Sequence, residues 1–249
     1  MRITGRVLWR GAWLGGELLL DGIRFAFLYL RTFGRPTRRQ RAQCLRQCAR
    51  GTMRPFLNRI EVMGRVPTSG LLVCNHLSYL DIVVLGSLTP TVFISKHEVK
   101  NWQVFGWFAS LGGTVYVRRE RRGQVGEVAA QIQSLLQDGQ LVVLFPEGTS
   151  SGGETVLPFK SSLLEPAVAG RHNLHAGCVA YQLDGGTVSD DVAYWGDMVF
   201  GPHLLKLLDR DFVTARVGFA DVPEPAADRK ALAKQLHAII SELHGRVRF

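Results

Sequence analysis

The first thirty residues combine a wide apolar surface with one narrow polar stripe. The stretch "VLWRGAWLGGELLLDGIRFAFLYL" covers residues 7–30 and is rich in Trp, Leu and Phe. Charged positions recur at steps of 7, 4, 3 and 7, which trace one line along a helix: Arg10, Glu17, Asp21, Arg24 and Arg31. The pattern predicts a helix that is apolar around most of its circumference.

The charges are inconsistent with a membrane-spanning helix and with a signal peptide. A spanning helix needs about 20 mostly uncharged residues, and here charge interrupts the run repeatedly. The same charges are inconsistent with the apolar core of a signal peptide. We therefore expect a helix lying in the membrane interface, with its wide face in lipid and its stripe toward protein or headgroups. A helix packed on the protein's own core is the alternative.

The remainder alternates short apolar runs with helical segments. Residues 35–60 predict a second, basic amphipathic helix. Beyond Ile60 the runs predict buried strands at 71–75, 91–95, 113–117, 141–145 and 175–181. Helices are predicted at 126–139 and 228–245, the second ended by Gly245. This alternation predicts a single α/β domain at 60–249, with a mostly parallel central sheet flanked by helices and preceded by the membrane-associating helices of 1–59.

Positive charge is concentrated at the N-terminal end. The first 60 residues hold 13 Arg against Glu17 and Asp21, a net +11, while the rest holds 17 basic and 19 acidic residues. Such a segment attracts nucleic acid or an anionic membrane surface, and the adjoining Trp, Leu and Phe favour the membrane. Nucleic acid is therefore not an expected partner. The four cysteines lack zinc spacing and predict reduced thiols in a cytoplasmic compartment.

The heptapeptide "NHLSYLD", Asn75 to Asp81, directly follows the first predicted strand. Ser78 and Asp81 fit a capping box, in which the serine caps a helix and the carboxylate reaches back to a backbone N–H. A capping box leaves His76 unexplained. A helix that starts here can also bring Asp81 to one ring nitrogen, which leaves the other free to act as a base. From this stretch alone both interpretations stay open.

Two other predicted strands end in charged groups. "GGTVYVRRERR" ends in four arginines between Arg118 and Arg122, and "LVVLFPEGTSSGG" ends with Glu147 in a turn. Active groups of α/β folds gather at the carboxyl ends of strands. A solvated arginine run and a turn carboxylate near a backbone N–H are the alternatives.

Together these stretches resemble the glycerolipid acyltransferases of the lysophosphatidic acid acyltransferase type. "NHLSYLD" matches the family's N-H-x4-D box, "YVRRE" its second box, and "FPEGTSS" its F-P-E-G-T-R-S box. "SKHEVKNWQVFGWFASLGGTVYVRR" resembles the family's linking segment, with Lys96 at its basic position. The match runs in order from about residue 60 to 181, roughly half of the chain.

The resemblance implies roles for individual residues. His76 would be the general base that deprotonates the acceptor's hydroxyl, and Asp81 would orient its ring. Arg119 would grip the acceptor's phosphate, and backbone N–H groups near Gly148 would receive the thioester oxyanion. The implied substrate-binding set is Lys96, Arg118, Arg119, Glu147, Gly148 and Thr149.

Three positions depart from the family pattern. Arg118 stands where an acidic or small residue is usual, Ser150 where arginine is usual, and Ala176 where proline is usual. These departures leave the acceptor's head group open. A non-phosphate lysolipid such as lyso-ornithine lipid is the alternative to 1-acylglycerol 3-phosphate.

Two further alternatives belong to other functional classes. "GTSSG" satisfies the G-x-S-x-G of serine hydrolases, with Ser150 as nucleophile and Asp184 and His203 as partners. The glycines after it are poor helix formers, whereas that motif must turn into a helix. A non-enzymatic binding module that uses the basic N-terminal segment is the other alternative. "HNLH", with His172 and His175, offers no third metal ligand.

The sequence thus predicts a monotopic O-acyltransferase of phospholipid biosynthesis on the cytoplasmic face of the inner membrane. The expected reaction moves a fatty acyl group from acyl-CoA or acyl-carrier protein to a lysolipid hydroxyl, with 1-acylglycerol 3-phosphate as the first acceptor. No metal or redox cofactor is expected, because a thioester is already activated.

Overall fold

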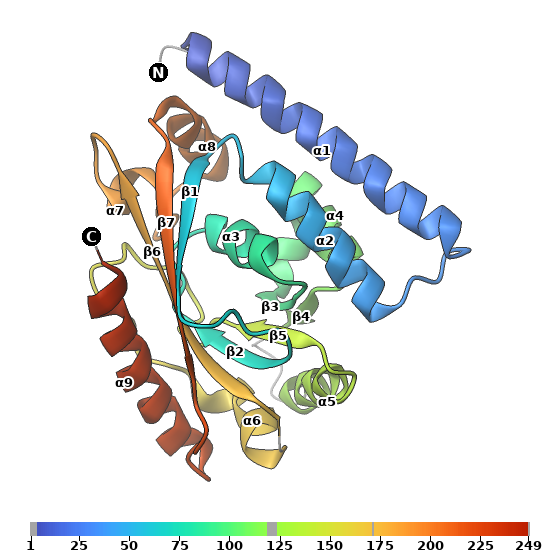
Figure 1. Cartoon of the computed structure of the whole chain (residues 1–249), viewed down its shortest axis with the longest axis vertical. Helices are drawn as coiled ribbons and strands as arrows, with labels where there is room; N and C mark the ends of the chain where they lie inside the picture. The colour runs from blue at the N-terminus through green and yellow to red at the C-terminus, as the bar shows by residue number, and fades with distance from the viewer. Residues whose placement is uncertain (1–3, 119–123, 171, 249) are drawn as a thin grey trace.

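A twisted sheet runs through the centre of the molecule (Figure 1). The computed structural model describes residues 4–118, 124–170 and 172–248. Within these residues the strand order is β1-β7-β6-β2-β5-β3-β4, and all neighbours pair in parallel except β6 and β7. The strands are β1 (Leu57–Met63), β2 (Gly70–Cys74), β3 (Val92–Lys96), β4 (Val115–Val117), β5 (Leu141–Leu144), β6 (Leu174–Leu183) and β7 (Val213–Asp221).

Helices cover both faces of this sheet. The helices are α1 (Gly5–Arg31), α2 (Arg38–Thr52), α3 (Leu80–Leu88), α4 (Gln103–Gly112), α5 (Gln124–Gln137), α6 (Glu165–Ala169), α7 (Val188–Asp191), α8 (Phe200–Asp209) and α9 (Arg229–Val247). One core joins α5, α6 and α9 to the sheet, through Ile132, Ala167 and Leu236 among others. The other face packs on α3 and α8, and α2 lies between α3 and the outermost helix, α1 (Figure 1).

The predicted α/β fold is confirmed, with each of the five predicted strands in the sheet. Strands β2 and β5 are buried along their whole length, which explains why they are continuous apolar runs in the sequence. The predicted C-terminal helix exists but continues past Gly245 to Val247.

The second predicted helix is wrong in its last residues. Helix α2 ends at Thr52, and Leu57–Met63 forms β1, which spans the expected domain boundary at residue 59. Polar side chains make β1 hard to detect, since Arg59 and Glu61 alternate with apolar positions. Glu61 pairs with Arg216 of the neighbouring strand β7 (2.9 Å). Strand β7 was also not predicted, because Thr214, Arg216 and Gly218 interrupt its apolar residues and leave no continuous apolar run.

Helix α1 is amphipathic in the sense the sequence predicts. Its narrow stripe faces the protein, with Arg10, Glu17 and Asp21 buried. The Arg10 guanidinium donates to the carbonyl of Arg210 (2.6 Å), and Asp21 accepts from Arg24 (2.5 Å) and from Thr52 of α2 (2.9 Å). No helix among the described residues is long and apolar enough to cross a membrane.

The opposite face of α1 is covered by no other part of the described chain. Large apolar side chains are exposed along it, up to 76% for Leu30: Leu8, Trp9, Leu19, Leu20, Ile23, Phe27 and Leu30. Contiguous exposed apolar surface of this kind is typical of an interaction face. The two interpretations offered by the sequence therefore describe opposite sides of one helix, because the polar stripe packs on the body while the wide apolar face stays open.

Candidate active site

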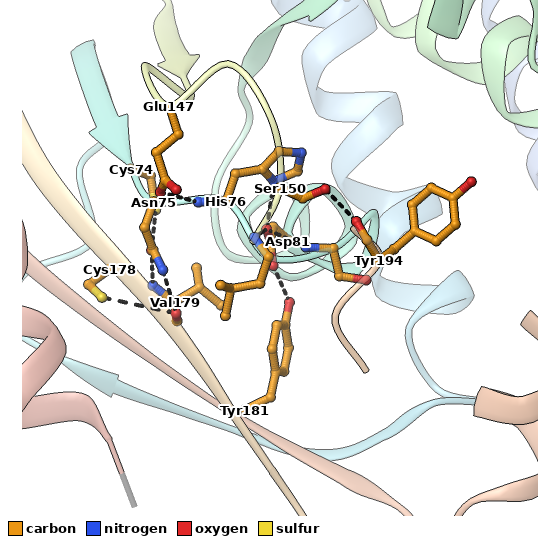
Figure 2. Close-up of polar contacts among 12 residues, drawn as sticks. Cys74, Asn75, His76, Asp81, Glu147, Ser150, Cys178, Val179, Tyr181 and Tyr194 are labelled. Carbon is orange, nitrogen blue, oxygen red and sulfur yellow. Dashed lines mark hydrogen bonds and ion pairs between the residues drawn. The ribbon is translucent and has the colours of Figure 1, made fainter. Parts of the chain in front are cut away.

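The site begins where β2 ends and the chain turns into α3. Asn75 follows Cys74, the last residue of β2, and its side-chain amide pairs with the backbone of Val179 on the adjacent strand β6 (Figure 2). It accepts from Val179 N (2.7 Å) and donates to Val179 O (3.0 Å). This double contact fixes the turn at the carboxyl edge of the sheet, the edge where α/β folds bind ligands.

His76 and Asp81 meet across this turn. The Nδ1 atom of His76 lies 2.7 Å from Oδ2 of Asp81, and the carboxylate is fully buried. Oδ2 also accepts from the backbone of Leu77 (2.7 Å) and Ser78 (3.0 Å). A carboxylate oxygen accepts hydrogen bonds, so the ring nitrogen that faces it is the donor. Nδ1 therefore carries the ring proton, and Nε2 is left as the free basic nitrogen.

Tyr181 completes the environment of this carboxylate. Its hydroxyl donates to Oδ1 of Asp81 (2.6 Å) from the middle of the sheet, on β6 (Figure 2). Burial raises the pKa of Tyr181, and the neighbouring Asp81 carboxylate raises it further, so the phenol keeps its proton. Both oxygens of Asp81 thus accept hydrogen bonds. Tyr181 was absent from the predicted site, since it lies 100 positions from its partner.

Only half of the predicted capping box is present. Asp81 does reach back to the amide of Ser78, as a capping box requires. The hydroxyl of Ser78 is buried and has no hydrogen-bond partner among the described residues, so the serine half of the box is absent. Asp81 therefore shapes the helix start and holds His76 with the same oxygen.

The backbone of His76 is held by the turn after β5. Its N–H donates to Oε1 of Glu147 (3.0 Å), its carbonyl accepts from Ser151 (3.0 Å), and its ring stacks on Phe145 at 4.2 Å between centroids. The other oxygen of Glu147 accepts from Leu157 N (3.3 Å). Burial raises the pKa of Glu147 to about 7. Its carboxyl binds the backbone of the turn and positions His76. Glu147 does not line the cavity, whereas the sequence predicts that it contacts the substrate.

A cavity of about 290 Å³ opens in front of His76. Of the predicted binding residues it is lined by Lys96, Gly148 and Thr149. Arg118 does not line it; this exposed side chain lies 2.7 Å from Nε2 of His97, the residue after Lys96. Arg119 lies outside the described residues. The structure thus brings together the histidine, one cation and the glycine turn.

A second, apolar cavity adjoins the first. It measures about 150 Å³ and extends between α1, α2 and α4, past Leu18, Leu45 and Phe108. The two cavities share five of their lining residues: Tyr79, Ile82, Ser95, Val99 and Trp102. An apolar space that continues from a polar, histidine-containing one fits a substrate with a reactive end and a hydrocarbon chain.

Comparison with known proteins agrees with this geometry. The family model described as Acyltransferase matches residues 59–179. A lyso-ornithine lipid O-acyltransferase of Brucella abortus is 37% identical over 199 residues, 74% of this chain and 74% of that protein. The chain belongs to the acyltransferase family. The family assignment expected from the three sequence boxes is therefore confirmed.

The relatives of this acyltransferase are named for two different acceptors. A 1-acyl-sn-glycerol-3-phosphate acyltransferase of Neisseria meningitidis is 31% identical, over 70% of this chain and 69% of that protein. A lyso-ornithine lipid O-acyltransferase of Rhizobium meliloti is 35% identical, and the match spans 62% of its length. The crystal structure of the 1-acyl-sn-glycerophosphate (LPA) acyltransferase from Thermotoga maritima shares the fold, with a TM-score of 0.63, 17% identity and coverage of 98% and 99% of the two chains.

Ser150 lacks the surroundings of a hydrolase nucleophile in this acyltransferase. Its hydroxyl donates to the carbonyl of Tyr194, and an irregular loop follows it instead of a helix. His203, the expected partner, binds the hydroxyl of Tyr79 through Nδ1 (3.0 Å). Tyr194, Trp195 and Gly196 line the cavity, and α8 then packs into the core.

Proposed function

We propose that the protein is an O-acyltransferase that moves a fatty acyl group from an acyl thioester to the free hydroxyl of a lysolipid. The observation that carries this proposal is the His76–Asp81 pair at 2.7 Å, at a cavity that continues into an apolar one. Nε2 of His76 has no hydrogen-bond partner among the described residues. Membership of the acyltransferase family supports the same reaction.

The reaction needs one base that later serves as an acid. Nε2 of His76 takes the proton of the acceptor's hydroxyl as its oxygen attacks the thioester carbonyl, and Asp81 stabilises the imidazolium that forms. The tetrahedral intermediate then collapses, the carbon–sulfur bond breaks, and the imidazolium returns the proton to the leaving thiolate. The products are an ester and a free thiol. The acceptor's own alcohol takes the place of a serine nucleophile.

The oxyanion of that intermediate needs hydrogen-bond donors at the cavity wall. The amide of Gly148 already donates to the carbonyl of Phe145 (3.2 Å). The amides of Thr149 and Ser150 donate to no acceptor in the described part of the chain, and both residues line the cavity. We therefore assign the oxyanion to these two amides, one or two positions beyond the glycine.

Two classes of head group fit the acceptor site, a phosphate and the head group of lyso-ornithine lipid. Lys96 in the cavity, with Arg118 outside it, favours an anionic group, and 1-acylglycerol 3-phosphate is the first acceptor proposed. Ser150 supplies no cation at the third box, and lyso-ornithine lipid, the acceptor named for the Brucella relative, is the alternative. A lyso-ornithine head group has a carboxylate that Lys96 can also bind.

The donor and the location follow from the same chemistry. Acyl-CoA and acyl-carrier protein both supply an activated thioester, so the proposed reaction uses no metal or redox cofactor. The exposed apolar row of α1 supports monotopic association with a membrane. We place it at the cytoplasmic face of the inner membrane, the side on which acyl-CoA and acyl-carrier protein are present. The apolar cavity between α1, α2 and α4 would hold the fatty acyl chain.

A panel assay tests the proposal. Purified protein is incubated with a labelled long-chain acyl thioester and, in turn, 1-acylglycerol 3-phosphate, lyso-ornithine lipid and an uncharged monoacylglycerol. We expect a labelled diacyl product from at least one charged acceptor, with one thiol released per ester formed. Release of free fatty acid without product from any lysolipid would overturn the proposal.

A further inference from the structure

The C-terminal helix α9 holds the loop that follows the proposed oxyanion turn. Three side chains, two within α9 and one at its C-terminal cap, donate to three carbonyls of this loop: His237 Nε2 to Val156 (3.2 Å), His244 Nε2 to Gly153 (3.1 Å) and Arg248 to Glu154 (3.2 Å). The donors recur at steps of 7 and 4 along the chain, so they share one face of the helix. A carbonyl only accepts hydrogen bonds, and each of the two imidazoles therefore carries its proton on Nε2.

These contacts replace hydrogen bonds that the loop does not make with itself. Residues 147–160 form no regular helix or strand, and none of the three carbonyls accepts a backbone N–H within the described part of the chain. The ends of the loop are closed by Lys160, whose N–H donates to the carbonyl of Pro146 (2.9 Å). Backbone carbonyls that leave water need a partner. For the middle of this loop α9 supplies it.

The same loop touches the catalytic turn. The N–H of Ser151 donates to the carbonyl of His76 (3.0 Å). Two residues later Gly153 has a φ of +86°, and a β-carbon there would lie 3.3 Å from the side chain of Leu77, the residue after His76. The two amides assigned to the oxyanion immediately precede Ser151. The carbonyl that His244 binds therefore belongs to the loop residue that packs beside the catalytic histidine.

We infer that α9 positions the oxyanion site of the proposed acyl transfer, with His244 as its central positioning residue. The helix is a rigid support, because Leu236, Ile240 and Leu243 anchor it in the core on one face of the sheet. Donors aimed at a developing oxyanion act without reorganisation only when their own support is fixed. The inference rests on the proposed function and assigns the support of its oxyanion site to a helix that lines neither cavity.

The chemistry of His244 suits a fixed support better than a proton carrier. Its side chain is buried, and burial lowers its pKa against the opposing effect of the hydrogen bond to Gly153, while the charge of Arg248 lowers it further. The ring is therefore neutral near neutral pH and donates as the Nε2–H tautomer. It lies outside the cavity that contains His76, so it holds the loop without contacting the substrate.

Matched variants of α9 test this role. His244→Leu removes the donor and keeps an apolar side chain, whereas His244→Gln keeps an N–H that can reach the same carbonyl. Gln235→Leu is the control, because Gln235 donates from the same helix to the carbonyl of Glu224 (2.9 Å), in a loop that lines neither cavity. We expect His244→Leu to lower kcat by about 10–100-fold with little change in KM, since the oxyanion forms only in the transition state.

Two comparisons separate positioning from a general loss of stability. His244→Gln should recover most of the lost rate, and Gln235→Leu should keep the wild-type kcat per folded enzyme, with folding followed by thermal unfolding of each variant. Equal kcat values for His244→Leu and Gln235→Leu would overturn the inference. A loss in His244→Leu that His244→Gln does not recover would also overturn it, because the N–H donor would then not be the cause.

Hydrogen exchange of residues 147–158 gives a readout that does not depend on activity. Loss of the His244 donor should speed exchange of these amides by about fivefold, while Gln235→Leu leaves them at the wild-type rate. Equal exchange in the two leucine variants would overturn the inference even if the wild type transfers acyl groups. Absence of acyl transfer by the wild type would instead refute the proposed function, and the exchange rates would still decide whether α9 holds the loop.

Discussion

Glu147 offers the sharpest test of how the catalytic turn is held. Both of its oxygens accept backbone N–H groups, from His76 and Leu157, and the carboxyl is 3% exposed. Burial, the larger effect, raises the pKa from 4.5 to about 7 against these two hydrogen bonds, which lower it. The folded chain therefore holds a proton on Glu147 at mildly acidic pH that the unfolded chain has already released.

This shift fixes the sign of a pH effect on stability. A carboxyl whose pKa is raised by folding contributes stability that is fully present below about pH 4.5 and is lost as the pH rises through about 7. A difference of about 2.5 pKa units corresponds to roughly 3 kcal/mol at most, at 1.36 kcal/mol per unit. Glu147→Gln keeps the size of the side chain and removes the titration. The free energy of unfolding of the variant should therefore fall less with rising pH than that of the wild type.

Urea denaturation between about pH 5 and pH 8 measures this difference, because other titrating groups contribute alike to both proteins and cancel. Glu154→Gln is the matched control, since Glu154 is an exposed carboxylate of the same loop. We expect its pH dependence to follow that of the wild type. Parallel curves for the wild type and Glu147→Gln, or a wild type that gains stability relative to the variant as the pH rises, would refute the reasoning.

Three further predictions concern the site, and one of them has a matched control substitution elsewhere. Asp81→Asn should lower the transfer rate by about 10³-fold or more, because the amide no longer holds the imidazole as the Nδ1–H tautomer; initial rates that stay within tenfold would contradict this. Tyr181→Phe should cost about 1.5–3 kcal/mol of unfolding free energy, the range for a buried hydrogen bond to a charged group. Tyr116→Phe loses only neutral partners and should cost less in the same denaturation series. Ile82→Trp should narrow the junction of the two cavities and reduce kcat/KM for long-chain thioesters more than for an acetyl thioester. Equal losses of kcat/KM for the two thioesters would show that the apolar cavity does not hold the acyl chain.

What the sequence predicts about this site is mostly local. His76 and Asp81 lie five positions apart across a helix start, so a chain turn alone brings them together. The five strands found by pattern are mostly buried and have continuous apolar runs. Strand β1 was missed because the polar partner of Glu61, Arg216, lies 155 positions away and makes a charged strand stable.

The remaining features depend on contacts between distant segments. Tyr181 reaches Asp81 from another strand, and the turn carboxylate of Glu147 is directed to the backbone of His76 by a fold that no spacing reveals. The basic segment shows the same limit. Most of its arginines bind internal acceptors, which the sequence pattern does not indicate.

The reaction itself is tested most directly by comparing two single variants. Labelled acyl thioester and the acceptor identified by the panel are given to wild type, His76→Ala and Ser150→Ala, and the ester product is measured under initial-rate conditions. Loss of the general base should reduce product formation by about 10²–10⁴-fold, while Ser150→Ala stays near the wild-type rate. Wild-type turnover by His76→Ala, or abolition of turnover by Ser150→Ala, would contradict acyl transfer through the imidazole.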